Sequence, residues 1–68
     1  MAPADLRNRF EFHPGTPDTV PVYGAVRALC LALAGELDNL APDCREKSLA
    51  ITRLEEVMFW TNAAVARN

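Results

Sequence analysis

The chain has 68 residues, of which 50% are hydrophobic, and a formal net charge of −2. A chain of this length buries only about 60% of the surface that its unfolded form exposes, so disulfides, a metal or association must add stability. The nearly balanced charge excludes the basic stripe that binding to a DNA or RNA polymer requires.

Of these three sources of stability, association fits the sequence best. Cys30, Cys44 and His13 do not have zinc-ligand spacing, so we predict neither a metal nor a cofactor. Residues 1–7 lack an apolar run followed by a cleavage site, so we expect an intracellular protein with reduced thiols. No apolar run approaches the about 20 residues that span a bilayer, so we expect no membrane segment.

Residues 1–18 are predicted to form an N-terminal arm. The run from Pro14 to Asp18 is rich in turn residues and cannot continue a helix. Residues 5–10 could form a short helical turn, but a segment of this length does not fold alone. Phe10 and Phe12 lie in this arm among charged residues. They either pack on the rest of the protein or contact a ligand.

Residues 19–40 are predicted to form a first long helix, with Thr19 as its N-cap and Pro21 in its first turn. This helix has an apolar stripe on one side and mostly alanines on the opposite side. A helix that is apolar on most sides is buried by more than one neighbour. One apolar stripe follows helical spacing: Val22, Val26, Leu29, Cys30, Leu33, Leu37 and Leu40.

Residues 43–67 are predicted to form a second helix. Asp43 with Glu46 three residues later resembles a capping box. Phe59 and Trp60 lie outside the stripe that suits packing on the first helix, and large exposed aromatics mark an interface or a ligand platform. That stripe consists of Ala50, Ile51, Leu54, Val57, Met58, Thr61, Ala64 and Val65.

The predicted fold is therefore all-α, with one domain over residues 1–68. A short N-terminal arm precedes a two-helix antiparallel hairpin. Because one hairpin cannot cover all its apolar sides, we expect the chain to assemble into a helical homo-oligomer.

Catalysis has little support in the residue types, and we expect no enzyme. His13 has no nucleophile pattern near it, so a hydrogen-bonded loop histidine is the better interpretation than a general base. Glu55 and Glu56 are adjacent and point about 100° apart on a helix, which does not make an acid–base pair. Cys44 stands at a helix start without a histidine partner.

Binding of an anion has better support. Tyr23 precedes Arg27 by one helical turn, so an aromatic ring and a guanidinium could together offer stacking and a phosphate contact. Arg45 lies in the first turn of the second helix, where free amides favour anions. The plainer alternative makes residues 45–47 a solvent-facing charged run and Tyr23 a packing residue of the hairpin. Residue types alone favour this alternative.

The second helix carries a specific resemblance. The run from Arg45 to Asn68 closely resembles the C-terminal signature of a phage-encoded family, approximately R-E-x-S-L-A-x-T-x-L-E-E-A-x-x-W-A-N-A-x-I-A-R. The arm from Asn8 to Pro14 and the pair of Tyr23 and Arg27 are also similar to that family, so the resemblance covers nearly the whole chain. The family is the second anti-CBASS family, small phage sponges for cyclic oligonucleotides.

This resemblance implies a function that composition does not. It implies a non-enzymatic homo-oligomer, a hexamer of interlocked helical protomers, in the cytoplasm of the infected bacterial host. Such an assembly sequesters cyclic dinucleotides such as 3′,3′-cGAMP in pockets between protomers, and cyclic trinucleotides at separate sites. The messenger then does not reach its CBASS effector. No nucleic-acid polymer and no membrane is an expected partner.

Candidate ligand residues follow from the same resemblance. For cyclic dinucleotides they are an arm aromatic and a first-helix cation with their neighbours: Phe12, His13, Pro14, Tyr23 and Arg27. For cyclic trinucleotides the expected residues lie near the start of the second helix: Arg45, Ser48, Thr52 and Arg53. Phe12 departs from the tyrosine of the family, which keeps a stacking face and loses a hydroxyl. The alternative function is a helical oligomer that binds a protein partner through Phe59 and Trp60.

Overall fold

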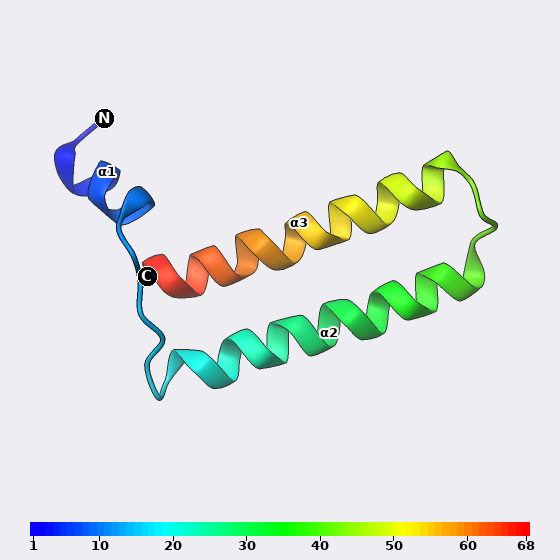
Figure 1. Cartoon of the computed structure of the whole chain (residues 1–68), viewed down its shortest axis with the longest axis horizontal. Helices are drawn as coiled ribbons and strands as arrows, with labels where there is room; N and C mark the ends of the chain where they lie inside the picture. The colour runs from blue at the N-terminus through cyan, green and yellow to red at the C-terminus, as the bar shows by residue number, and fades with distance from the viewer.

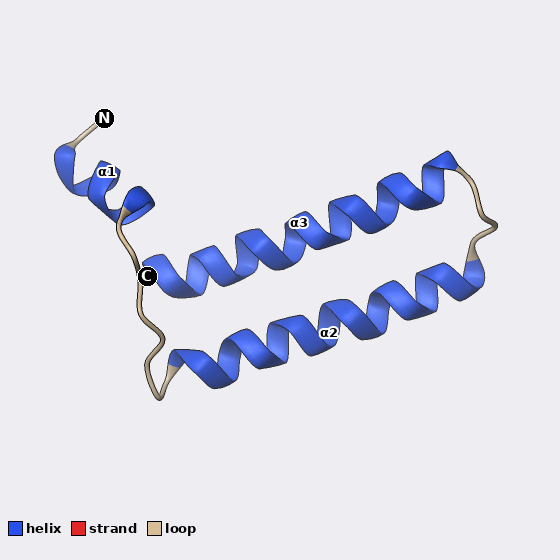
Figure 2. Ribbon diagram, viewed as in Figure 1, coloured by secondary structure: helices blue, strands red, loops and turns tan.

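The computed structural model describes residues 1–68 and contains three helices and no strand. The helices are α1 (Pro3–Phe10), α2 (Thr19–Leu40) and α3 (Arg45–Arg67). α2 and α3 lie side by side and antiparallel, and α1 lies beyond the open end of this hairpin, near the C-terminus (Figures 1 and 2). The predicted all-α hairpin is confirmed.

A pair of threonines starts α2. The amide of Thr16 donates to Oγ1 of Thr19 (2.8 Å), and the amide of Thr19 donates to Oγ1 of Thr16 (3.1 Å). The carbonyl of Thr16 accepts from the amide of Val20 (3.0 Å). Thr16 therefore caps the turn that leads into α2, and the prediction that Thr19 is the cap is wrong. Pro17 follows Thr16, where its missing N–H costs nothing. A Cβ on Gly15 would lie 2.7 Å from Cγ2 of Val20, so a larger residue here would require the Val20 side chain to shift.

The cap of α3 also differs from the prediction. Cys44 is the N-cap, and its Sγ accepts a hydrogen bond from the amide of Lys47 (3.4 Å). The carboxylate of Asp43 binds the ammonium of Lys47 instead (2.7 Å). The predicted capping box of Asp43 with Glu46 is therefore wrong, because Asp43 lies one residue before the N-cap and the N3 position is Lys47.

The two long helices meet along stripes narrower than the predicted ones. The half-buried residues at spacings that face the partner helix are Tyr23, Val26, Cys30, Ala34 and Leu37 on α2, and Ile51, Leu54, Met58, Asn62 and Val65 on α3. The prediction that the whole of each stripe packs on the other helix is wrong for the remaining residues, which are exposed: Val22, Leu29, Leu33, Leu40, Ala50, Val57, Thr61 and Ala64. A single helix partner covers about half of an apolar face of this width.

The hairpin is a single layer of helices. The molecule measures 45 × 30 × 13 Å, and its shortest dimension is close to the diameter of one helix, about 10–12 Å. None of the 68 residues is buried, and the accessible surface is 5405 Å², whereas a compact monomer of this mass exposes about 4,200 Å². Both faces of the hairpin are thus open.

α2 is both long and apolar. By length and composition alone, its 22 residues are long and apolar enough to cross a membrane. Arg27, Glu36 and Asp38 interrupt the apolar run of this helix, but its valines, leucines and alanines keep the mean hydropathy high. A helix covered on several sides by other helices has the same composition.

Candidate functional site

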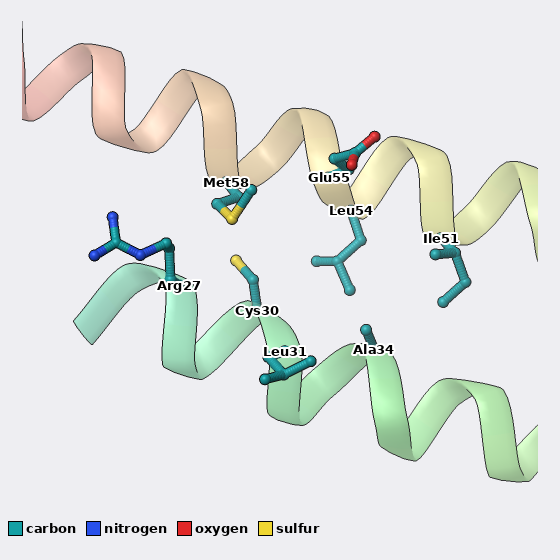
Figure 3. Close-up of a pocket in the computed structure, with 8 residues that line it drawn as sticks. All are labelled: Arg27, Cys30, Leu31, Ala34, Ile51, Leu54, Glu55 and Met58. Atoms are coloured by element: carbon teal, nitrogen blue, oxygen red, sulfur yellow. The ribbon is translucent and has the colours of Figure 1, made fainter. Parts of the chain in front are cut away.

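A groove runs along one side of the hairpin, between α2 and α3. It has a volume of about 220 Å³, and six of the eight residues that line it are hydrophobic. Arg27 extends from α2 at one end, and the sulfur atoms of Cys30 and Met58 face each other across its floor (Figure 3). Glu55 lines the same groove from α3. The groove therefore combines an apolar floor with a cation at one end and a carboxylate contributed by α3.

The Arg27 guanidinium has no partner within the chain. It takes part in none of the three ion pairs and in none of the side-chain hydrogen bonds. One of its Nη atoms lies 4.0 Å from the position that a Cβ on Gly24 would occupy, so the guanidinium passes over a residue without a side chain. An unpaired guanidinium beside open space can bind an anion with two parallel hydrogen bonds.

Tyr23 stands one turn before Arg27 on α2. Its side chain is half-buried on the face toward α3, so it packs the hairpin, as the plainer alternative expected. Its hydroxyl nevertheless forms no hydrogen bond within the chain. Tyr23 therefore packs in the hairpin and still leaves its hydroxyl free for a ligand.

The arm residues do not meet Arg27 within one chain. Phe12 is 86% exposed, and Pro14 is exposed beside it. Nε2–H of His13 donates to the carbonyl of Asn8 (2.6 Å), which ties the loop to the end of α1. Figure 1 shows this loop passing the open end of the hairpin. Because its ring is almost fully exposed, Phe12 packs on no other part of its own chain.

The second set of candidate residues lies on the exposed side of α3. Arg45, Ser48 and Thr52 are exposed and follow a three- and four-residue spacing, so they share one face of the helix. Arg53 lies on the adjacent face and pairs with Glu56 (2.7 Å). The structure therefore brings the first three together and leaves Arg53 apart.

Lys47 is the charged residue whose place the sequence analysis missed. The plainer alternative placed it on the solvent face, but its side chain is only 12% exposed. Its ammonium donates to the carbonyls of Asp38 (2.9 Å) and Ala41 (3.2 Å) and pairs with the carboxylates of Asp38 (2.8 Å) and Asp43 (2.7 Å). The four-residue spacing of Asp43 and Lys47 was the available signal, because such pairs meet on a helix surface.

The model of the hairpin domain of the Acb2/Tad1 family matches residues 2–66, which include all three helices. The chain belongs to this family. The Acb2/Tad1 proteins are phage anti-CBASS proteins that act as sponges for cyclic oligonucleotides. No curated protein and no solved structure matched the chain in the other two comparisons.

Membership in the Acb2/Tad1 family confirms the resemblance drawn from the second helix and the arm. The proteins of this family bind their ligands rather than converting them, which fits a groove that pairs an apolar floor with a cation. The family acts inside the infected host cell. The family match does not by itself assign a role to Arg27, to the arm or to the start of α3.

Proposed function

We propose that this chain sequesters cyclic dinucleotides such as 3′,3′-cGAMP in the cytoplasm of an infected bacterium, so that CBASS effectors are not activated. The observation that carries the proposal is the unpaired Arg27 guanidinium at the end of an apolar groove, in a chain of the Acb2/Tad1 family. The groove floor suits the face of a base, and the guanidinium suits a phosphate.

The working unit that we propose is a homo-oligomer. The chain exposes about 1,200 Å² more surface than a compact monomer of its mass, and a standard interface covers about 800 Å² of each partner. The exposed large hydrophobic residues lie on both long helices and include Leu29 (72%), Leu33 (49%) and Val57 (53%). Further copies of the hairpin would cover them. A hexamer is the number that the family resemblance implies.

Assembly also explains how the dinucleotide site is completed. The loop that holds Phe12, His13 and Pro14 passes the open end of the hairpin, and the Phe12 ring is almost fully exposed. We therefore place the arm of one protomer against the groove of another, where Phe12 stacks on a base and Arg27 binds a phosphate. Tyr23 adds a ring and a free hydroxyl beside Arg27.

A second class of ligand, the cyclic trinucleotides, would use the start of α3. Arg45, Ser48 and Thr52 supply one cation and two hydroxyl groups on one exposed face. Arg53 would join only by leaving its pair with Glu56, a change that costs little for an exposed pair.

Sequestration works by mass action and needs no chemical step. The free messenger falls when the sponge is abundant and its Kd lies below the signalling concentration. The chain offers no catalytic constellation that would degrade the messenger, and release of intact ligand from denatured complex would show this directly.

Isothermal titration tests the proposal. The full chain, with its oligomeric mass measured by sedimentation, is titrated with 3′,3′-cGAMP and separately with cyclic tri-AMP. Heat of binding to the dinucleotide supports the main proposal, and heat with the trinucleotide supports the second site. The absence of heat with both ligands, from folded oligomeric protein, would contradict the proposed function.

A protein partner remains the second candidate, because of one observation. Phe59 and Trp60 are 56% and 66% exposed on α3, and they border a shallow groove with Glu56, Ala63 and Arg67. If this surface bound a different protein, a specific partner would be captured from infected cells and the titrations would show no nucleotide binding.

A further inference from the structure

Two unpaired charges of opposite sign line the groove between α2 and α3. Arg27 and Glu55 both border it, yet neither takes part in an ion pair or in a side-chain hydrogen bond. Figure 3 shows the two groups on opposite helices and apart from each other. The phosphate contact proposed for Arg27 leaves the Glu55 carboxylate without a role.

The register of the two helices gives the spacing of these charges. Cys30 and Met58 face each other across the groove floor (Figure 3). Because the helices are antiparallel, three residues back from Met58 correspond to three residues forward from Cys30. Glu55 therefore lies level with Leu33, six residues beyond Arg27. At about 1.5 Å per residue this separation is about 9 Å along the groove, similar to the span of a purine nucleotide from its phosphate to the outer edge of its base.

An apolar surface lies between the two charges. Leu31 lines the groove between the level of Arg27 and that of Glu55, and its side chain is 75% exposed. Past Glu55 the groove continues into a second hollow of about 260 Å³, which shares Ala34 and Ile51 with the first. A flat base over Leu31 would therefore have its phosphate near Arg27 and its outer edge near Glu55, with open space for the rest of a cyclic dinucleotide.

The carboxylate of Glu55 distinguishes one purine from the other. An ionised carboxylate has two acceptor oxygens side by side and no donor. Guanine carries two adjacent donors, N1–H and the N2 amino group, on its Watson–Crick edge. Adenine has the lone pair of N1 on that edge, next to its N6 amino group. Guanine therefore satisfies both oxygens, whereas adenine places an acceptor against one of them.

We propose that Glu55 binds the Watson–Crick edge of guanine in the bound cyclic dinucleotide and selects guanine over adenine. This inference rests on the proposed function. Oε1 and Oε2 accept from N1–H and from the N2 amino group, while Arg27 binds a phosphate of the same nucleotide. A carboxylate in a site for a dianion otherwise opposes binding by like-charge repulsion, and two charge-assisted hydrogen bonds to guanine offset this repulsion.

One titration series tests the proposal. Wild type and Glu55→Gln are titrated with cyclic di-GMP, 3′,3′-cGAMP, cyclic di-AMP and the 3′,3′-cGAMP analogue in which hypoxanthine replaces guanine. The analogue keeps N1–H and lacks the N2 amino group. Glu36→Gln is the matched control, because Glu36 is exposed, forms no ion pair and lines no groove. The melting temperature and sedimenting mass of each variant are measured in parallel.

Glu55→Gln should weaken binding of cyclic di-GMP and of 3′,3′-cGAMP about tenfold, which is about 1.4 kcal/mol, and should not weaken binding of cyclic di-AMP. Wild type should bind the hypoxanthine analogue more weakly than 3′,3′-cGAMP, and this difference should disappear in Glu55→Gln. Because Glu55 is exposed and unpaired, the variant should keep the melting temperature and mass of wild type. Glu36→Gln should match wild type with all four ligands.

Other results would overturn the inference. Equal weakening of the guanine and adenine ligands, or no weakening of any, would mean that Glu55 does not select the base. A changed sedimenting mass of Glu55→Gln, with an unchanged ratio of guanine to adenine affinity, would assign Glu55 to contacts between copies. Failure of wild type to bind any ligand contradicts the proposed function as well, whereas wild-type binding with an unchanged ratio in Glu55→Gln contradicts this inference alone.

Discussion

Lys47 near the start of α3 holds Asp38 near the end of α2 by two contacts. Its ammonium donates to the Asp38 carbonyl at 2.9 Å and pairs with the Asp38 carboxylate at 2.8 Å. A cation at the C-terminal end of a helix also satisfies carbonyls that lack an intrahelical partner. The pair therefore fixes the hairpin turn, and hence the register in which α2 and α3 meet.

This contact predicts how stability depends on pH. The Asp38 carboxylate, followed by that of Asp43, raises the pKa of Lys47 above its ordinary value of 10.5. A hydrogen bond from Lys47 and its charge lower the pKa of Asp43 below 3.8. The lysine contribution is therefore complete below pH 10.5 and is lost as pH rises above it, and the aspartate contribution is complete above pH 3.8 and is lost as pH falls below it.

Lys47→Met tests this expectation. The variant should melt at a lower temperature than wild type at pH 7, and the difference should shrink at pH 3 and at pH 11, measured by circular dichroism. Arg53→Met is the control, because the exposed Arg53–Glu56 pair is worth no more than about 1 kcal/mol. A melting temperature of Lys47→Met equal to that of the control at pH 7 would mean that the turn does not depend on this lysine.

The exposed stripe of α2 should carry the association of copies. Leu29 is 72% exposed in the chain, and full burial of a leucine contributes about 1.5–3 kcal/mol. Leu29→Ala should therefore weaken association by about 10- to 150-fold, measured as a shift in the concentration dependence of the sedimenting mass. Helix content should stay unchanged. Asn39→Asp should sediment like wild type; an unchanged mass distribution in Leu29→Ala would place the interface elsewhere.

Arg27 should contribute to binding of the dinucleotide without contributing to the fold. Its guanidinium has no partner to lose, so Arg27→Ala should leave the melting temperature and the oligomer unchanged. Loss of a charge-assisted phosphate contact should weaken 3′,3′-cGAMP binding by about 1.5–3 kcal/mol, measured by titration calorimetry. Arg53→Ala serves as the matched arginine control. If both variants bind alike, Arg27 does not contact the phosphate.

Substitution of Trp60 tests whether its exposed side chain binds a second copy of the chain or a different protein. Its side chain is 66% exposed in the single chain. If a second copy buries it, Trp60→Ala should cost the assembly about 3–5 kcal/mol and shift sedimentation to smaller species. If it binds another protein instead, the oligomer should persist and only partner capture should be lost.

Much of the fold is determined by the sequence itself. The spacing of apolar residues predicts two long helices, the Pro14–Asp18 run predicts the break before them, and the width of both apolar faces predicts association. The run from Arg45 to Asn68 carries the family resemblance that the match over residues 2–66 confirms. These features are local, so they depend on periodicity and residue type along the chain.

Tertiary structure decides which charged groups find a partner within the chain and which apolar groups stay exposed. Lys47 belongs to a charged run in the sequence, but the turn brings the Asp38 carbonyl and carboxylate to its ammonium. Leu29 stays exposed because a single partner helix covers only part of a wide apolar face. Contacts between residues distant in the chain depend on register and orientation, which periodicity does not specify.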